Sequence, residues 1–369
     1  MNILILGGGK SGEHEVSLVS AASIARHIDT VRHTVHLGGI AKDGRWYLLG
    51  DGELSRLRGD ETAAFRISGN EQELVVRPGA GIALARGGSL AVDVVFPALH
   101  GTFGEDGTIQ GLLECAGLPY VGCGVMASAV AMDKEKTKIL WSHAGLPVVP
   151  WVCLCRADLD TGGMREKAAQ AEARFGYPVF VKPACTGSSV GITKTKNREE
   201  LEAAVLEAFT WDNKVILEKG MNAREIECSV TGNSVLDHQA VMHEAGEVVP
   251  HAEFYDYNAK YIDPDGAALL IPAPLGCAQR ELIAYIARLA YAALDCSGLA
   301  RVDFFLDKGS GDIYLNEINT MPGFTAISMF PKMCAAAGVA YPDLIELLLQ
   351  DAVRRFRAFQ SLRTDWITD

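Results

Sequence analysis

Two apolar segments near the C-terminus carry charged and amide side chains at alternating positions. Arg301 and Asp303 lie two residues apart in the first segment. Glu317 and Asn319 have the same spacing in the second. Residues at this spacing share one face of a strand, and the sequence DKGSG at 307–311 predicts a turn that pairs the two strands. Two carboxylates and a carboxamide oxygen suit Mg²⁺ that also holds substrate phosphates, and the arginine would stabilise a transferring phosphoryl group.

The alternative for these segments is a hairpin with a solvated charged face, which many proteins contain. Against it, the alternate positions carry apolar residues, among them Val302, Phe304 and Ile318. One face of each strand is therefore expected to pack against the hydrophobic core, which favours a metal site on the opposite face.

A second group of residues could hold a nucleotide. Lys182 leaves an apolar strand directly before GSSVG at 187–191, where backbone N–H groups could wrap a phosphate. An ordinary glycine turn is the alternative for this loop. Lys134 lies on a preceding helix, and Glu218 and Lys219 end another apolar strand, as a hinge reading an adenine edge would. We therefore expect a nucleotide between two domains, with metal ligands supplied by a third segment.

The glycines at the N-terminus fit two nucleotide-binding patterns incompletely. Residues 7–12 match G-x-G-x-x-G, but no acidic residue ends the next strand at 34–37 to bind a ribose. Residues 9–11 (GKS) resemble the tail of a Walker A loop, whose first glycine would fall at Leu4. We interpret the segment instead as a glycine-rich turn that lets a ligand approach backbone amides.

The elements that position these residues follow an α/β pattern in the first third of the chain. Strands are expected at 3–6 and 93–98 and a helix at 16–28, which indicates a doubly wound parallel sheet with ligands beyond the strand ends. The polar, turn-rich segment 41–90 predicts an antiparallel insertion. A long helix is expected at 127–144, ending at a glycine and a proline.

The rest of the chain predicts two further units. The second has helices at 162–175 and 199–209 around a strand at 179–182. The third is rich in strands, with two covering helices at 279–294 and 344–359. Its strands are expected at 215–218, 225–231, 235–241, 300–306 and 312–318.

Composition limits the function classes. The 369 residues are 49% hydrophobic, and 34 Lys and Arg against 46 Asp and Glu give a net charge of −12, which argues against a general nucleic-acid binder. The nine cysteines form no C-x-x-C pair, and neither a signal peptide nor a membrane-spanning run is evident. We expect a cytoplasmic protein with reduced thiols that binds neither nucleic acid nor membranes.

Four motifs resemble those of the D-alanine–D-alanine ligase family. Residues 100–111 (HGTFGEDGTIQG) are similar to its N-terminal signature, and 298–323, with ARVDFF and YLNEINTMPG, to its second signature. Residues 253–261 (EFYDYNAKY) resemble its mobile loop, and SGEHEVSL at 11–18 also matches. The resemblance runs from about residue 3 to about residue 350.

The resemblance implies an ATP-grasp fold, in which a doubly wound N-terminal domain precedes two α+β domains that hold ATP between them. We place the domains at 1–122, 123–212 and 213–369. The implied reaction joins two D-alanines through an acyl phosphate, with ATP as co-substrate and two Mg²⁺ ions, or Mn²⁺ in their place. The implied assembly is a homodimer.

The resemblance also assigns roles to residues. The catalytic set is the trio Glu13, Ser188 and Tyr261, with Arg301 and the Gly323 amide at the oxyanion. The metal ligands are Asp303, Glu317 and Asn319. The ATP-binding residues are Lys134, Lys182, Ser189, Glu218, Lys219, Met221, Glu225 and Lys260. The residues near the amino-acid substrates are Val16, His100, Ser328 and Met329.

The second substrate is the main alternative that the sequence leaves open. Related ligases join D-lactate or D-serine, but their D-lactate members lack the Lys260-Tyr261 pair and tend to carry Arg where this chain has Met329. Met329 would give a small apolar wall for the methyl group of D-alanine. Cys185 and Gly220 depart from the family pattern and put nucleotide-side contacts in doubt. An inactive nucleotide-binding module is a further alternative, although all expected catalytic groups are present.

Overall fold

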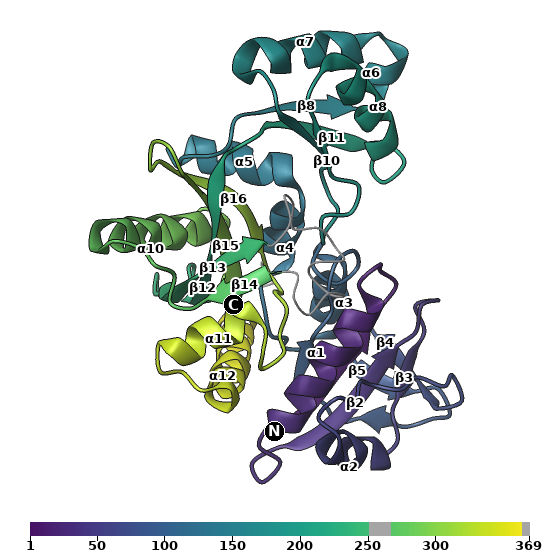
Figure 1. The fold of residues 1–369 in the computed structure, drawn as a ribbon. Coiled ribbons are helices and arrows are strands. Elements are labelled where there is room, and N and C mark those ends of the chain that lie inside the picture. The colour runs from purple at the N-terminus through teal and green to yellow at the C-terminus, as the bar shows by residue number, and fades with distance from the viewer. Residues whose placement is uncertain (251–266, 364–369) are drawn as a thin grey trace.

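Three β-sheets organise the chain into three lobes (Figure 1). The computed structural model describes residues 1–250 and 267–363. The N-terminal lobe contains a seven-stranded sheet, the central lobe a four-stranded sheet and the C-terminal lobe a five-stranded sheet. In Figure 1 the C-terminal lobe lies between the other two.

The N-terminal sheet is parallel in one half and antiparallel in the other, with the strand order β6-β5-β4-β3-β2-β1-β7. The parallel strands are β1 (Asn2–Gly8), β2 (Thr34–Ile40) and β7 (Val94–Pro97). The antiparallel strands are β3 (Trp46–Leu48), β4 (Gln72–Arg77), β5 (Gly81–Leu84) and β6 (Ser89–Leu90). The predicted strands and the antiparallel insertion are confirmed; the insertion also contains the helix α2 (Gly52–Gly59).

Strand β1 is buried on both faces, which explains its uninterrupted apolar sequence. Ile3 and Ile5 join a core with α1 (His14–His27), whereas Leu4 and Leu6 join a second core with α3 (Thr108–Ala116). Helices therefore cover both faces of this sheet, as the predicted doubly wound arrangement requires.

The long helix expected at 127–144 is wrong, because the chain breaks at Asp133. It forms α4 (Val125–Met132) and α5 (Lys134–His143), with Asp133 extended between them. The Asp133 carboxylate accepts the backbone N–H groups of Glu135 and Lys136, both at 3.1 Å. Helical periodicity continues through the break, but an aspartate N-cap favours a new start at this point.

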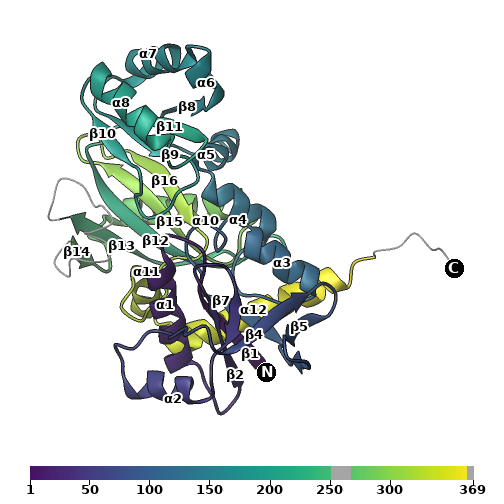
Figure 2. The ribbon, with the colours of Figure 1, turned by 90° about the vertical axis from the view of Figure 1, so that its right-hand side faces the viewer.

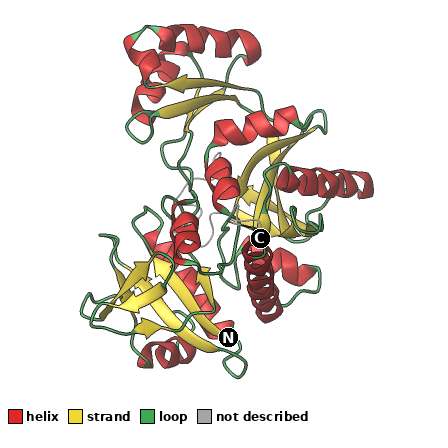
Figure 3. Ribbon diagram, turned by 180° about the vertical axis from the view of Figure 1, so that it is seen from behind, coloured by secondary structure: helices red, strands yellow, loops and turns green. Residues whose placement is uncertain are grey.

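The central lobe has the strand order β10-β9-β11-β8, and its helices lie on one side of the sheet (Figure 3). Its strands are β8 (Trp151–Cys155), β9 (Val179–Pro183), β10 (Thr193–Thr195) and β11 (Lys214–Lys219). Its helices are α6 (Ala157–Asp160), α7 (Gly163–Phe175) and α8 (Arg198–Ala208). The expectation that the strand at 215–218 belongs to the third unit is wrong, because β11 pairs with β8 and β9 in the central sheet.

The C-terminal lobe is an antiparallel sheet in the order β14-β13-β12-β15-β16. Its strands are β12 (Ala223–Asn233), β13 (Val241–Pro250), β14 (Ala267–Leu270), β15 (Ser297–Asp307) and β16 (Ile313–Asn319). The strand expected at 235–241 is wrong, because the Asn233 side chain accepts the N–H groups of Val235 and Leu236 and forms a turn.

In the described part of the C-terminal lobe, the helices are α10 (Cys277–Ala292), α11 (Met329–Ala336) and α12 (Tyr341–Gln360). Helix α12 runs alongside the N-terminal lobe (Figure 2), and its buried residues share one core with β1 and α1. Among the described residues no single helix is long and apolar enough to cross a membrane; α11 and α12 together, bent by 101°, meet the same criteria of length and composition.

Candidate active site

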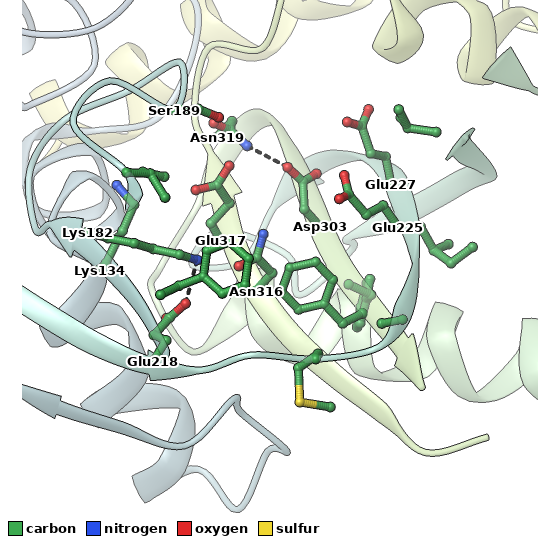
Figure 4. A pocket seen from close by; sticks show the side chains of 18 of the residues that line it. Lys134, Lys182, Ser189, Glu218, Glu225, Glu227, Asp303, Asn316, Glu317 and Asn319 are labelled. Atoms are coloured by element: carbon green, nitrogen blue, oxygen red, sulfur yellow. Dashed lines mark hydrogen bonds and ion pairs between the residues drawn. The ribbon is translucent and has the colours of Figure 1, made fainter. Parts of the chain in front are cut away.

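A cavity of about 670 Å³ lies where the central and C-terminal lobes face each other, and it gathers most of the predicted site residues. Figure 4 shows Lys134 and Lys182 on one side of it and Asp303, Glu225 and Glu227 on the other. The predicted residues on its nucleotide side are Lys134, Lys182, Ser188, Ser189, Glu218, Lys219, Met221 and Glu225. Those on its metal side are Arg301, Asp303, Glu317 and Asn319.

The break before α5 places Lys134 at the edge of this cavity. The Lys134 backbone N–H donates to the Ala184 carbonyl at 3.0 Å, and its ammonium donates to the Thr186 carbonyl at 2.6 Å. The first residue of α5 is therefore tied at two points to the loop that follows β9. In that loop Ser188 and Ser189 adopt positive φ angles of 51° and 59°, which indicates a constrained backbone.

Glu218 on β11 is buried between two lysines. One oxygen forms an ion pair with Lys182, and the other lies 2.7 Å from the ammonium of Lys138. Burial would raise the pKa of Glu218, but the charges of Lys138 and Lys182 lower it to about 2. The carboxylate that we expected at the adenine edge is thus engaged by lysines. Sequence reasoning missed Lys138, although it lies one helical turn after Lys134.

The acidic side of the cavity is built by the register of three neighbouring strands. Asp303 on β15 lies opposite Glu317 on β16 and opposite Glu227 on β12. Arg301 lies opposite Asn319, so the predicted hairpin and the shared face of the two pairs are confirmed. Glu227 was missed by sequence reasoning, although its spacing of two from Glu225 marks the same strand face.

Hydrogen bonds join Arg301, Asp303 and Asn319. The guanidinium of Arg301 donates two hydrogen bonds to the Asp303 carboxylate, at 2.8 and 2.7 Å. Its Nε also lies 3.1 Å from Glu227 Oε2. The Asn319 amide donates to Asp303 Oδ2 at 2.9 Å, which leaves its carbonyl oxygen for another partner. Burial raises the pKa of Asp303 to about 7, opposed by Arg301 and reinforced by Glu227 and Glu317.

These residues fit a hard divalent cation. Within 1–250 and 267–363 no three His, Cys, Asp or Glu side chains converge as a metal site. Asp303, Glu317 and Asn319 supply only two carboxylates and one carboxamide. Such a set can hold Mg²⁺ when substrate phosphates and water supply the remaining ligands. The pKa of Asp303 is raised mainly by burial, with Glu227 and Glu317 adding to the effect, and a bound cation would favour the ionised carboxylate.

The N-terminal lobe contributes a second group of site residues. The Ser188 hydroxyl donates to the Glu13 carboxylate, which brings two members of the predicted trio together. Nearby, Glu105 accepts the N–H groups of Gly101 and Met321, at 2.8 and 3.1 Å. Burial and the charge of Glu13 raise the pKa of Glu105 to about 8. Glu105 lines the cavity but was named only within the N-terminal signature.

His100 is buried with both ring nitrogens engaged by the protein. Its Nδ1 lies 2.9 Å from the Met321 carbonyl, so it carries the proton, and its Nε2 lies 2.8 Å from the Ser20 hydroxyl. Burial lowers the pKa of His100 despite the attraction of Glu13. A neutral ring in this position links α1 to the loop after β16. It offers a substrate no free ring nitrogen among its described contacts.

The remaining substrate-side residues lie apart from the large cavity. Val16 is half-buried on α1, one turn after Glu13. The Ser328 hydroxyl is 2.7 Å from that of Thr325, and a Cβ on Gly323 would lie 3.3 Å from it. Met329 packs in an apolar cluster with Val248 and Met333.

Two predictions from the sequence concern the glycine-rich turn after β1 and the loop at 253–261. The Gly8 N–H, at the end of β1, donates to the Ser17 hydroxyl, and the Gly9 N–H donates to the Ile40 carbonyl, both at 2.8 Å. The approach of a ligand to the other amides of this glycine-rich turn stays a prediction. Lys260 and Tyr261 lie outside the described residues, as does the loop at 253–261.

Family models match most of the chain. The model for the D-ala D-ala ligase N-terminus matches residues 2–123, and the model for the D-ala D-ala ligase C-terminus matches residues 140–350. The chain belongs to the D-alanine–D-alanine ligase family. The resemblance found from the motifs is thereby confirmed.

Relatives and solved structures of this family extend over the whole chain. The D-alanine--D-alanine ligase of Treponema denticola is 53% identical over 99% of both chains, and that of Acetivibrio thermocellus is 44% identical over 96% of both. The solved D-alanine-D-alanine ligase from Coxiella burnetii is 34% identical, with a TM-score of 0.83 over 98% of this chain and 97% of that one. The VanG D-Ala:D-Ser ligase from Enterococcus faecalis is 35% identical, with a TM-score of 0.82 over 95% and 99%. The predicted ATP-grasp fold of the family is confirmed.

Proposed function

We propose that this protein joins two D-alanines to D-alanyl-D-alanine, with ATP converted to ADP and phosphate, for peptidoglycan precursor synthesis. The convergence of Lys134, Lys182, Arg301 and Asp303 on one cavity carries the proposal. The 53% identical relative named as such a ligase supports it. Phosphoryl transfer depends mainly on positioning and on neutralising charge, which these residues are suited to do.

The residue roles form part of the proposal. Lys134 and Lys182 hold ATP phosphates, as does Lys260, which lies outside the described residues. Arg301, with the Gly323 amide, stabilises the oxyanion that forms when an amine attacks the acyl phosphate. The ATP-side set is completed by Ser189, Glu218, Lys219, Met221 and Glu225.

Asp303, Glu317 and Asn319 would hold Mg²⁺, or Mn²⁺ in its place. Bound there, the metal ions would neutralise charge on the phosphates during transfer. The Glu13 carboxylate attracts the ammonium of an amino-acid substrate, and Ser188 and Tyr261 link it to the loop at 253–261. Closure over the site would exclude water, which otherwise hydrolyses an acyl phosphate.

Substrate choice, assembly and compartment are also proposals. We propose D-alanine as second substrate, with Val16, His100, Ser328 and Met329 around the amino acids. The D-Ala:D-Ser ligase among the solved structures makes D-serine the second candidate. We further propose a cytoplasmic location, since the reaction uses ATP and makes a precursor, and a homodimer, which the family resemblance implies.

The test is a coupled assay with purified protein, ATP, Mg²⁺ and one D-amino acid at a time. We expect phosphate release with D-alanine alone and D-alanyl-D-alanine by mass spectrometry. No phosphate above the control without amino acid would contradict the proposal, and a predominant D-alanyl-D-serine product from mixed substrates would favour the second candidate.

Glu317→Gln tests the metal assignment in the same assay. We expect turnover to fall about 100-fold or more, because a neutral amide replaces a charged ligand. Glu281→Gln on the exposed face of α10 is the matched control and should retain turnover. Wild-type turnover in Glu317→Gln would refute the metal role of this residue.

A further inference from the structure

Lys138 is a fully buried lysine to which the proposed reaction gives no role. It lies on α5, four residues after Lys134, and its side chain is 1% exposed. An ammonium is costly to remove from water, so it is retained in such a place only with a charged partner. Within the described part of the chain its ion-pair partner is Glu218, at 2.7 Å.

Glu218 also pairs with Lys182 through its other oxygen, so one carboxylate is shared by two lysines. The three side chains carry a net charge of one positive unit. Without Lys138, Glu218 and Lys182 would form a neutral pair, and the carboxylate would be held by Lys182 alone. Lys182 would then present little charge to the cavity that it lines.

Position within the fold supports a role beyond packing. Lys138 and Lys134 lie on one side of α5, whereas Glu218 and Lys182 lie on neighbouring strands of the central sheet. Burial lowers the pKa of Lys138, and the nearby charge of Glu218 opposes this. The pKa of Glu218 is lowered to about 2, so its carboxylate is ionised at neutral pH.

We infer that Lys138 is a positioning residue for nucleotide binding: it holds Glu218 so that the charge of Lys182 stays directed at the phosphates. The inference rests on the proposed placement of the triphosphate beside Lys134 and Lys182. Lys138 itself does not line the cavity and touches no phosphate in this arrangement.

Calorimetric titration of ADP and of adenosine into the full-length protein separates a charge effect from a general loss of structure. For Lys138→Met we expect the Kd for ADP to rise at least tenfold and the Kd for adenosine to change less than twofold. Lys136→Met is the matched control, because Lys136 lies on the exposed side of the same helix. An unchanged Kd for ADP, or an equal rise for adenosine, would overturn the inference.

The double variant Lys138→Met/Glu218→Gln tests the route through Glu218. Removing both charges leaves no unpaired carboxylate to neutralise Lys182, so we expect its Kd for ADP to lie within threefold of that of Glu218→Gln. A further tenfold weakening would show that Lys138 acts by another route. The double variant can still be compared with Glu218→Gln if Lys138→Met does not fold, because it does not bury a Glu218 carboxylate that has lost the charge of Lys138.

Lys182→Met distinguishes this inference from the function on which it rests. If Lys182→Met binds ADP as the wild type does, the placement of the triphosphate is wrong. If it weakens ADP binding and Lys138→Met does not, only the role of Lys138 is refuted.

Discussion

At the scale of single residues, the environment decides what each ionisable group can do. His100 is neutral because burial outweighs the attraction of Glu13, and its two ring nitrogens bridge Ser20 and Met321. Glu218 is ionised although buried, because Lys138 and Lys182 pair with it. The same residue types on the surface would have ordinary pKa values.

We predict that His100 makes the protein less stable as the pH falls. Its pKa is lowered in the folded state, so below pH 6.5 the unfolded chain takes up a proton that the folded chain does not. Stability is lost there by up to about 1.4 kcal/mol per pH unit. Urea unfolding at pH 7.5 and 5.5 should show a smaller loss in His100→Gln than in the wild type.

His143→Gln is the control for this comparison. His143 is exposed at the end of α5, so this variant removes a histidine from the surface rather than from the core. Equal pH dependence of wild type and His100→Gln would contradict the assignment of a neutral, buried ring.

At the scale of secondary-structure elements, the start of α5 is the feature on which the site depends. Asp133 caps this helix, and its carboxylate also forms an ion pair with Lys214 on β11. The next residue, Lys134, is bound to the loop after β9. These few residues therefore fix the start of α5, its contact with the central sheet and the position of Lys134, for which we propose a role in phosphate binding.

For Asp133→Ala we predict that the free energy of unfolding falls by about 1–2 kcal/mol, because the helix loses its N-cap. We also predict that the KM for ATP rises about fivefold or more, a change that needs less than about 1.4 kcal/mol of binding free energy at fivefold. The KM would rise because Lys134 is no longer held in place. Urea unfolding and initial rates at varied ATP measure the two effects.

Asn197→Ala provides a matched comparison. Asn197 caps α8 by accepting the Glu200 N–H at 2.9 Å, and it does not line the cavity. A similar loss of stability with an unchanged KM is expected for this variant. If both variants raise the KM equally, the effect comes from stability alone.

At the scale of the whole molecule, the site exists only where the lobes meet. Glu13 comes from the N-terminal lobe, Lys182 from the central sheet and Arg301 from the C-terminal sheet. The net charge of −12 gives no hint of this pocket, because a few cations from separate segments determine its local potential.

Arg355 on α12 forms hydrogen bonds to both the N-terminal and the C-terminal lobe. Its guanidinium donates to the carbonyls of Tyr120 and Gly122 and to the Ser297 hydroxyl, and it lies 4.5 Å from the centre of the Tyr120 ring. We predict that Arg355→Met lowers the free energy of unfolding by about 2–4 kcal/mol, because partly buried acceptors lose a charged donor. The urea midpoint measures this loss.

Arg357→Met should change the urea midpoint little, since Arg357 is exposed on the same helix. Equal effects of the two substitutions would show that the hydrogen bonds of Arg355 contribute no more than helix propensity or surface charge.

The sequence alone determined the features that depend on neighbours in the chain. The apolar run at 3–6 predicts a strand of a parallel sheet, and the spacing in 301–303 and 317–319 with the turn between them predicts the hairpin that aligns Asp303 with Glu317. Strand periodicity and turn chemistry are local, so they can be recognised from adjacent residues. The family motifs carried the rest of the assignment.

Only the tertiary structure decided which partners each polar group meets. The Gly8 and Gly9 N–H groups, for example, donate to Ser17 and Ile40, which lie on other elements. Lys138 and Glu218 are 80 positions apart in the sequence and meet across two elements. Pairing between distant segments follows from how helices and sheets pack, which no local pattern encodes, and for this reason the positioning of the predicted site could be obtained only from the folded chain.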